Sequence, residues 1–402
     1  MKFFVKPMAV LTAVLMLFIF FGEEVRAQGR TLKLGYLDAL TGPMAVYGIP
    51  QKEGIMMAVE EINEAGGLAI GNEKIKIELL ISDHGTKSAE AVSIVEKYIE
   101  RDKVKIIFGE ILSSSAMAWA PVVERYKGKV MGFCTGPSSS AISRLHPHIY
   151  NSKWVIETSF KGGAFLAKYL KLKKMYLMIE ADDYSIMLAK GTREEFEKNG
   201  GKVVKEGHFN LHDTDFYTQL SSIKGMDIDC IYVAGLQTPT QFIFKQAKEL
   251  GIKAVLAASI GAGEKDTLSR FKCADMEGVY DVGTPIDALL QSGREITVRI
   301  ANKYKQKYGK DMAVLALAGY GGVYMLAKGL EKAGTIDDIE KIMKGLSALT
   351  VKEMDHLLPF AQLPAPGTDK LFNKDRQTMT ENLVGKWENC RIKFVTSVQR
   401  LQ

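Results

Sequence analysis

Two serine clusters are the residues of this sequence best placed to bind a small molecule. Ser113-Ser114-Ser115 follows the apolar run 104–108, and Ser138-Ser139-Ser140 follows the run 130–133. If both runs are parallel strands, the clusters lie at the carboxyl edge of one sheet, where open α/β sheets bind ligands. A helix that begins at each cluster would direct free N–H groups and its positive end at an anion such as a carboxylate. The alternative is that the serines only cap these helices.

Catalytic motifs are absent from the sequence. It contains no G-x-x-x-x-G-K-[ST] phosphate loop, no G-x-S-x-G nucleophile motif, no H-E-x-x-H zinc motif and no G-x-G-x-x-G dinucleotide fingerprint. His208 and His212, with Asp213 and Asp215, could hold a metal at the surface, but a solvated loop is the simpler interpretation. We therefore expect a protein that is not an enzyme and that needs no cofactor or metal.

The charge pattern argues against a nucleic-acid partner. The chain has 402 residues, with 53 Lys and Arg against 47 Asp and Glu, and a formal net charge of +6. Charges of both signs alternate, as in Glu194, Glu195, Glu197 and Lys198. Such alternation is typical of a solvated surface, and the length is that of two or three globular domains.

The first residues have the features of a secretory signal peptide. Lys2 and Lys6 precede an apolar run at 8–21, and Val25-Arg26-Ala27 offers small residues where a signal peptidase reads them. The run is shorter than the roughly 18 apolar residues of a membrane span. We expect residues 1–27 to be removed and the mature chain to be a periplasmic protein.

Four cysteines are widely separated. Cys134 and Cys230 lie in apolar, strand-like runs, where a buried free thiol is the simpler interpretation. Cys273 and Cys390 form the one pairing that deserves a test in an oxidising compartment, and the sequence leaves the disulfide state open.

Short apolar strands alternate with amphipathic helices along the chain, which predicts parallel sheets covered on both faces. A first set has strands at 32–36, 75–81, 104–108 and 130–133 and helices near 55–62, 92–99 and 117–126. The segment His146-Pro147-His148 breaks the rhythm. A second set has strands at 175–179, 202–209, 228–234, 254–258 and 279–282 and helices at 184–199, 214–223 and 239–250. We therefore expect two α/β lobes, with three further helical stretches at 292–308, 316–333 and 336–345.

The sequence also resembles a known family. The string Leu-Thr-Gly-Pro-Met-Ala-Val-Tyr-Gly at 40–48, with 58–68 and Asp83, is similar to the opening of the periplasmic leucine/isoleucine/valine-binding proteins. The likeness continues through 109–115, 136–139, 319–322 and 333–335. The resemblance implies a type I periplasmic-binding fold: two Rossmann-like lobes with parallel sheets, joined by a multi-strand hinge. Lobe 1 would comprise 31–148 plus 283–352, and lobe 2 would comprise 149–282 plus 353–402.

What the resemblance implies about function is capture of a small ligand. The protein would be a periplasmic monomer that closes over a branched-chain or other apolar amino acid and delivers it to an ABC permease. A periplasmic sensor module is the alternative that the sequence cannot separate from transport. The ligand-binding residues at the matching positions are Tyr47, Ser113, Ser114, Pro137, Ser138, Tyr184, Leu236, Gln237 and Ser259.

In that family the serine cluster and the next loop hold the amino acid's carboxylate and ammonium. Here those roles would fall on Ser113 and Ser114, on the Pro137 backbone and on Ser138. Tyr47 and the other pocket tyrosine could instead simply pack beside helix starts.

One position departs from the family pattern. Where amino-acid binders have an acid that pairs with the ligand ammonium, this chain has Ser259. An unpaired buried ammonium costs several kcal/mol, so an amino-acid ligand would need another partner, such as Asp182 or Asp183. Otherwise the ligand would lack the amine and would be an aliphatic or aromatic carboxylate, an amide or urea.

Overall fold

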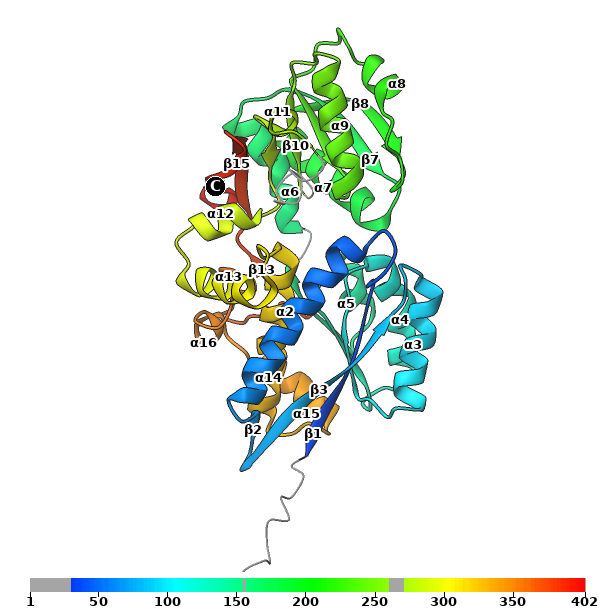
Figure 1. Cartoon of the computed structure of the whole chain (residues 1–402), viewed down its shortest axis with the longest axis vertical. Coiled ribbons are helices and arrows are strands. Elements are labelled where there is room, and N and C mark those ends of the chain that lie inside the picture. The colour runs from blue at the N-terminus through cyan, green and yellow to red at the C-terminus, as the bar shows by residue number, and fades with distance from the viewer. Residues whose placement is uncertain (1–29, 155–156, 260–270, 402) are drawn as a thin grey trace, which may run out of the picture.

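A computed structural model describes residues 30–154, 157–259 and 271–401, and Figure 1 shows that they form two lobes stacked along the long axis. Each lobe is built on one sheet. The lower sheet has the strand order β12 (Gln362–Leu363), β13 (Gln377–Thr380), β6 (Ile149–Trp154), β5 (Met131–Cys134), β4 (Ile106–Gly109), β1 (Thr31–Asp38), β3 (Glu73–Asp83), β2 (Leu68–Ile70). The upper sheet has the order β15 (Arg391–Ser397), β14 (Leu383–Glu388), β11 (Tyr280–Asp281), β10 (Val255–Ala258), β9 (Cys230–Ala234), β7 (Lys174–Glu180), β8 (Lys202–Phe209).

Helices cover both faces of the lower sheet, as Figure 1 shows. On one face lie α2 (Ala45–Glu64), α14 (Val314–Ala333) and α15 (Ile339–Ser347), and on the other lie α3 (Ser88–Glu100) and α4 (Ser113–Glu124). Shorter or flanking helices are α5 (Ala141–Leu145), α13 (Glu295–Tyr308) and α16 (Val351–Met354). Strand residues alternate between the faces: Tyr36 packs against α2 and α14, whereas Leu37 packs against α3 and α4. This alternation with burial on both sides is the reason the strands read as short apolar runs.

The upper lobe follows the same plan. One face packs against α6 (Glu157–Ala164), the π-helix η1 (Phe165–Tyr169) and α7 (Asp183–Lys198). The other packs against α8 (Tyr217–Ser221), α9 (Gln237–Glu249) and α11 (Cys273–Met276). At the sheet edge, α12 (Ile286–Gln291) contacts β14 and β15, and the described chain ends in the 3₁₀ helix η2 (Val398–Leu401).

The expected α/β class with two parallel-dominated sheets is confirmed. The central strands pair in parallel, as β1 does with β3 and β4 and β7 with β8 and β9. Antiparallel strands close the edges: β2 pairs with β3, β12 with β13, and β14 with both β11 and β15. The apolar rhythm of the sequence did not predict these edge strands.

The lobe boundaries differ from the division expected from sequence. The strand β6 pairs with β5, and β13 pairs with β6, so residues 149–154 and 362–380 belong to the lower sheet. The expected division placed both segments in lobe 2. The turn at Pro147 comes directly before β6, which belongs to the lower sheet, so it does not mark the passage between the lobes.

The chain passes between the lobes three times: after β6, between β11 and α13, and between β13 and β14. The second and third passages are tied together. The Thr284 hydroxyl donates to Asn382 Oδ1 at 3.0 Å, and the Asn382 amide donates to the Val282 carbonyl at 2.7 Å. The Thr284 N–H also donates to the Leu383 carbonyl at 3.0 Å. These bonds make the two neighbouring passages a single hinge element.

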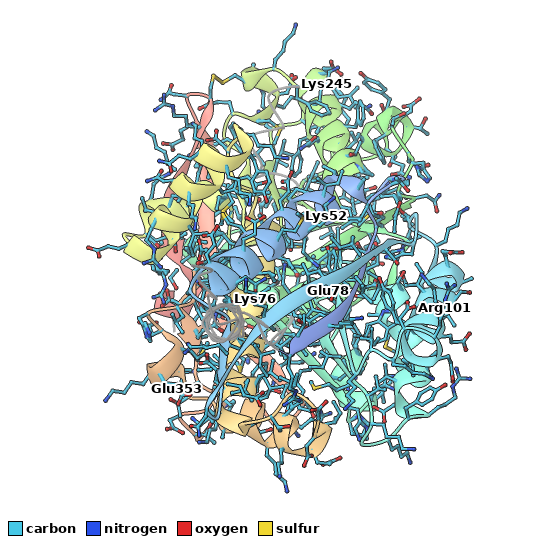
Figure 2. All side chains as sticks on the ribbon, turned by 60° about the horizontal axis from the view of Figure 1, so that its bottom comes forward. Lys52, Lys76, Glu78, Arg101, Lys245 and Glu353 are labelled. Carbon is cyan, nitrogen blue, oxygen red and sulfur yellow. A yellow bond between two sulfur atoms is a disulfide. The ribbon has the colours of Figure 1, made fainter. Side chains whose placement is uncertain are left out.

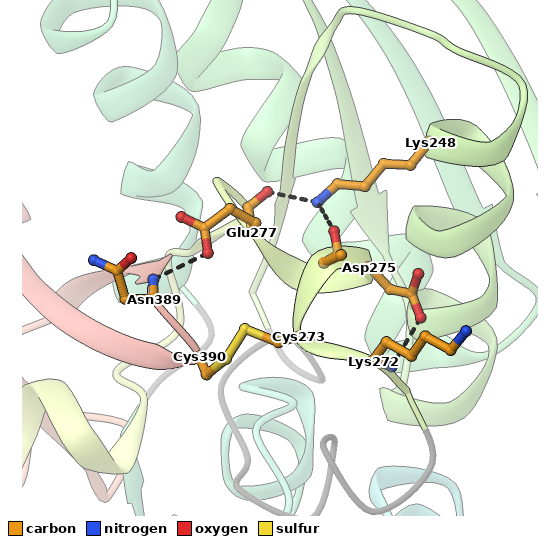
Figure 3. Close-up of a disulfide and its surroundings, with 8 residues drawn as sticks. Lys248, Lys272, Cys273, Asp275, Glu277, Asn389 and Cys390 are labelled. Atoms are coloured by element: carbon orange, nitrogen blue, oxygen red, sulfur yellow. Dashed lines mark hydrogen bonds between the residues drawn. A yellow bond between two sulfur atoms is a disulfide. The ribbon is translucent and has the colours of Figure 1, made fainter.

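A disulfide joins Cys273 to Cys390, the pairing singled out from the sequence, and Cys134 and Cys230 are buried free thiols. Figure 3 shows the surroundings of the bond, at the start of α11 and the tip of the β14–β15 hairpin. Lys248 Nζ donates to the carbonyls of Ala274 and Glu277 at 2.9 and 2.5 Å, and the Asn389 N–H donates to the Glu277 carboxylate at 3.0 Å. The disulfide therefore reinforces a contact between the hairpin and α11 that the Asn389–Glu277 hydrogen bond also stabilises.

The surface carries scattered charge. Figure 2 shows Arg101 and Glu353 projecting from opposite sides of the molecule, and Lys76 and Glu78 two residues apart on β3. No helix in the described ranges is long and apolar enough to cross a membrane. The expected signal peptide at 1–27 lies outside the described residues.

Candidate functional site

A cavity of about 290 Å³ lies between the two lobes. Lobe 1 contributes the loops after β4 and β5 and the starts of α2 and α14. Lobe 2 contributes the loops after β7, β8, β9 and β10, and the hinge adds residues 283–285. The helices α4 and α7 contact each other across it. The cavity is thus placed at the carboxyl edges of both sheets, where open α/β sheets bind ligands.

Three serines of the two clusters, Ser113, Ser114 and Ser138, line this cavity from lobe 1. Helix α4 begins at Ser113, but its N-cap is Leu112 and no side chain caps it; Ser140 precedes α5 without a capping bond either. The serines are therefore not caps. Ser113 Oγ accepts from the Ser139 N–H at 3.4 Å, which ties the two loops together, while Ser114 is exposed to the cavity.

Buried acids fix the backbone of the serine loop from below. Asp38 Oδ1 accepts from the Ile111 N–H at 3.1 Å, and Glu110 accepts from the Leu112 N–H at 3.1 Å and from the Trp119 indole at 3.0 Å. Burial raises the pKa of Asp38 to about 6 and the pKa of Glu110 well above its usual range. Desolvation disfavours the charged carboxylate, and backbone donors offset part of that cost at Asp38.

Apolar side chains from both lobes pack together at one side of the cavity. Met44, Tyr47 and Leu315 of lobe 1 are buried together, and Leu211 and Leu236 of lobe 2 pack against them. The two lobes therefore meet through apolar contacts beside the polar loops. A ligand with an aliphatic or aromatic part would complete this contact, because burial of apolar area drives the closure.

The lobe 2 wall of the cavity is acidic. Glu180, Asp182, Asp183 and Asp281 line it, and Lys153 at the end of β6 is the one lysine or arginine among the described lining residues. Glu180 is 1% exposed, and its Oε2 accepts from the Leu236 N–H at 2.7 Å, at the start of α9. Burial raises the pKa of Glu180 to about 7. This carboxyl sits where a helix N-terminus favours its ionised form and desolvation opposes it.

The other acids of the lobe 2 wall either form hydrogen bonds within the protein or are exposed. Asp182 caps α7, since its Oδ1 accepts from the N–H groups of Tyr184 and Ser185 at 2.9 and 3.1 Å, and its Oδ2 is buried without a hydrogen-bond partner. Asp183 is exposed. Asp281 accepts from the Gly283 N–H at 2.8 Å and interacts with further groups.

Ser259 and the hinge form the floor. Ser259 is 2% exposed and lines the cavity, and its Oγ has no hydrogen-bond partner. Gly283 approaches it so closely that a Cβ would lie 1.4 Å from the Ser259 carbonyl oxygen. Only glycine permits this approach of hinge and loop.

Of the nine residues expected at the site, the structure places seven around the cavity. These are Tyr47, Ser113, Ser114, Ser138, Tyr184, Leu236 and Ser259. Pro137 is not among the lining residues, and its carbonyl accepts from the Asn151 amide at 2.7 Å. The side chain of Gln237 lies outside the described residues.

Sequence reasoning missed Glu180, Asp281 and Lys153. A signal existed for Glu180, which directly follows the strand predicted at 175–179 and is the last residue of β7, so that it lies at the ligand edge of its sheet. Lys153 is the last but one residue of β6 and Asp281 is the last of β11, both beside the passages between the lobes, so their position depended on the lobe boundaries.

Two α/β lobes, a three-passage hinge and, between the lobes, a cavity lined by both polar and apolar side chains define a ligand-binding protein of the two-lobed type. Comparison with known proteins agrees. The family model described as "Periplasmic binding protein" matches residues 31–391, and the chain belongs to that family.

The chain is also similar to particular members. It is 28% identical to a leucine-, isoleucine-, valine-, threonine- and alanine-binding protein of Pseudomonas aeruginosa over 80% of this chain and 83% of that protein. A leucine-binding protein from Thermotoga maritima superposes with a TM-score of 0.77 at 23% identity, covering 91% of this chain and 98% of the other. A solute-binding protein from R. palustris in complex with benzoate superposes with a TM-score of 0.73 at 16% identity, covering 92% and 96%.

Proposed function

We propose that this protein is an ABC-transporter substrate-binding protein that captures a small apolar α-amino acid, of the branched-chain type, between its lobes. The observation that carries the proposal is the polarity of the cavity. Serine hydroxyls at the start of α4 face it from lobe 1, buried acids face it from lobe 2, and apolar side chains of both lobes lie beside them. A zwitterion with an apolar side chain matches all three.

In this proposal Ser113, Ser114 and Ser138 hold the ligand carboxylate, and Tyr47, Tyr184 and Leu236 surround the rest of the molecule. An apolar part of the ligand adds to the contacts that Leu211 and Leu236 make with Met44, Tyr47 and Leu315 in the closed form. Ligand binding therefore shifts the population from open to closed lobes by its differential affinity for the closed form, and the permease reads that state.

The test is a thermal-shift and calorimetric panel on the mature protein after removal of co-purified ligand. Leucine, isoleucine and valine are compared with aliphatic and aromatic carboxylates, amides and urea. An amino acid at about 100 times its Kd is expected to stabilise the protein by roughly 2.7 kcal/mol. A shift with amine-free compounds alone would replace the amino-acid assignment.

A second candidate ligand class is an amine-free carboxylate. Two observations favour it: Ser259 stands where an ammonium-binding acid was expected, and the buried Lys153 lines the cavity. The similar fold from R. palustris was solved with benzoate. The same panel separates the two classes, since benzoate and leucine differ in the ammonium group.

We further propose that the exported protein begins at Gln28, acts as a periplasmic monomer and has no catalytic activity. The apolar run after Lys6 and the small residues before Gln28 support cleavage. Mass spectrometry of the protein recovered from the periplasm would locate its first residue, and light scattering would give its oligomeric state.

A further inference from the structure

Among the acids of the cavity wall, Glu180 is the one best placed to pair with a bound cation. It is almost fully buried, it lines the cavity, and its recorded hydrogen bond within the described chain comes from the Leu236 N–H. The charged groups that affect it are Asp182 on its own loop and Asp213 after β8, both acidic. A buried carboxylate that faces only other acids is costly unless a cation comes from elsewhere.

The other acids are less suited to this task. Asp182 caps α7 through Oδ1, and its Oδ2 is buried without a hydrogen-bond partner. Asp281 already interacts with further groups, and Asp183 is exposed at the cavity mouth. Lys153, on the hinge side of the cavity, has its own interactions.

We propose that the Glu180 carboxylate is the counter-charge for the ligand ammonium, in place of the acid that is absent at position 259. The inference rests on the proposed function, because it assumes a ligand with a free α-ammonium. It names the residue that sets specificity for amines at this site. The buried, unpartnered Ser259 hydroxyl lines the same cavity and can accept a second ammonium hydrogen.

Glu180 is also positioned to make binding depend on pH. Desolvation is the main cause of the shift, and Asp182 and Asp213 add to it, so that the Glu180 carboxyl has a pKa of about 7. Among the described residues, Tyr47, Tyr184, Asp183, Asp281 and Lys153 are the other titratable groups that line the cavity. Because the ammonium binds the ionised form, acidification from pH 8 to pH 5 should weaken leucine binding by up to about 100-fold.

The test uses calorimetry with leucine and with 4-methylpentanoate, which is leucine without its amine. Glu180→Gln keeps the size and a hydrogen-bond acceptor but removes the charge, and should weaken leucine binding by about 10- to 100-fold. It should leave 4-methylpentanoate bound at least as well as in wild type. The matched control is Glu194→Gln on α7, whose side chain is exposed and should leave both affinities unchanged.

The pH profile gives a readout that a merely structural role would not move. Wild type should lose leucine affinity on acidification, whereas Glu180→Gln should show a flat profile. If Glu180→Gln fails to fold, Glu180→Asp keeps the charge one methylene further back, and it should bind leucine more weakly with the acid sensitivity retained.

Three results would overturn the inference. Equal leucine affinity in wild type and Glu180→Gln would place the ammonium elsewhere and leave the proposed function intact. Equal wild-type affinity for leucine and 4-methylpentanoate would show that no ammonium site exists. Binding of no amino acid by wild type would remove the proposed ligand class, and the inference with it.

Discussion

Removing the disulfide should destabilise lobe 2 by several kcal/mol. Cys273 and Cys390 are 117 residues apart, and the loop-entropy relation gives about 5 kcal/mol at 25 °C for a loop of that length. This figure is an upper value, because measured effects of disulfide removal start near about 2 kcal/mol. The Asn389–Glu277 hydrogen bond remains in Cys273→Ala/Cys390→Ala, as do the backbone bonds that join Trp387 on β14 to residues 278 and 279, so the hairpin should keep its place beside α11.

The measurement is urea unfolding of wild type and the double variant, followed by tryptophan fluorescence and far-UV circular dichroism. Trp387 on β14 is 2% exposed and reports on lobe 2, while Trp119 is buried on α4 and reports on lobe 1. Wild type reduced with dithiothreitol should match the variant. A loss below about 1 kcal/mol, or four titratable thiols in unfolded wild type, would refute the reasoning.

Three further predictions concern the cavity wall. Gly283→Ala would place a Cβ 1.4 Å from the Ser259 carbonyl oxygen. We therefore expect thermal melting to show a loss of more than about 3 kcal/mol in the free energy of unfolding, and calorimetry to show no leucine binding. A stable variant that binds leucine would contradict the close approach of these two residues. Raising the pKa of Glu180 from 4.5 to about 7 means that the folded state binds its proton more tightly than the unfolded state, so stability falls as pH rises through this range. In urea unfolding, ligand-free Glu180→Gln should therefore have the same free energy of unfolding as wild type at pH 4 and a value up to about 3 kcal/mol higher at pH 8. Equal free energies of unfolding at pH 8 would argue against an ionised, unpaired Glu180. Ser259→Ala removes a buried hydroxyl without a partner, so the ligand-free melting temperature should not fall, while leucine affinity measured by calorimetry should drop about 3- to 10-fold; unchanged affinity would show that the hydroxyl does not contact the ligand.

The parts of the fold that the sequence predicted are those with strong periodicity. Buried central strands such as β4 and amphipathic helices such as α3 and α13 have burial patterns that the residue types report directly. Edge strands do not: β2 and β12 are two or three residues long, and β13 is Gln-Thr-Met-Thr. Their pairing is decided by the sheet they join, which local sequence does not encode.

The residues of the candidate site, like the elements of the fold, could be predicted only in part. The serine loops followed from the rule that ligands bind at the carboxyl ends of parallel strands, and from the family resemblance. Glu180 follows the same rule, but Asp182 and Asp183 come two and three residues later, and the sequence alone does not show which of these acids faces the ligand. Lys153 and Asp281 reach the cavity only because the passages between the lobes bring β6 and β11 together with the loops of both sheets. Such a meeting of distant segments depends on tertiary structure.

The three passages between the lobes also set the order in which the chain can fold during synthesis. The face of the lower sheet that carries Tyr36 is covered partly by α14, which begins at Val314, and that sheet is extended by β13 near residue 380. The upper sheet receives its last strands, β14 and β15, only after residue 383. Only the face under α3 and α4 is built from an early stretch of chain, residues 37–149, and neither lobe can complete its core until most of the chain has left the ribosome. The N-terminus therefore emerges long before either lobe is complete, which leaves time for an export machinery to engage a chain that is not fully folded.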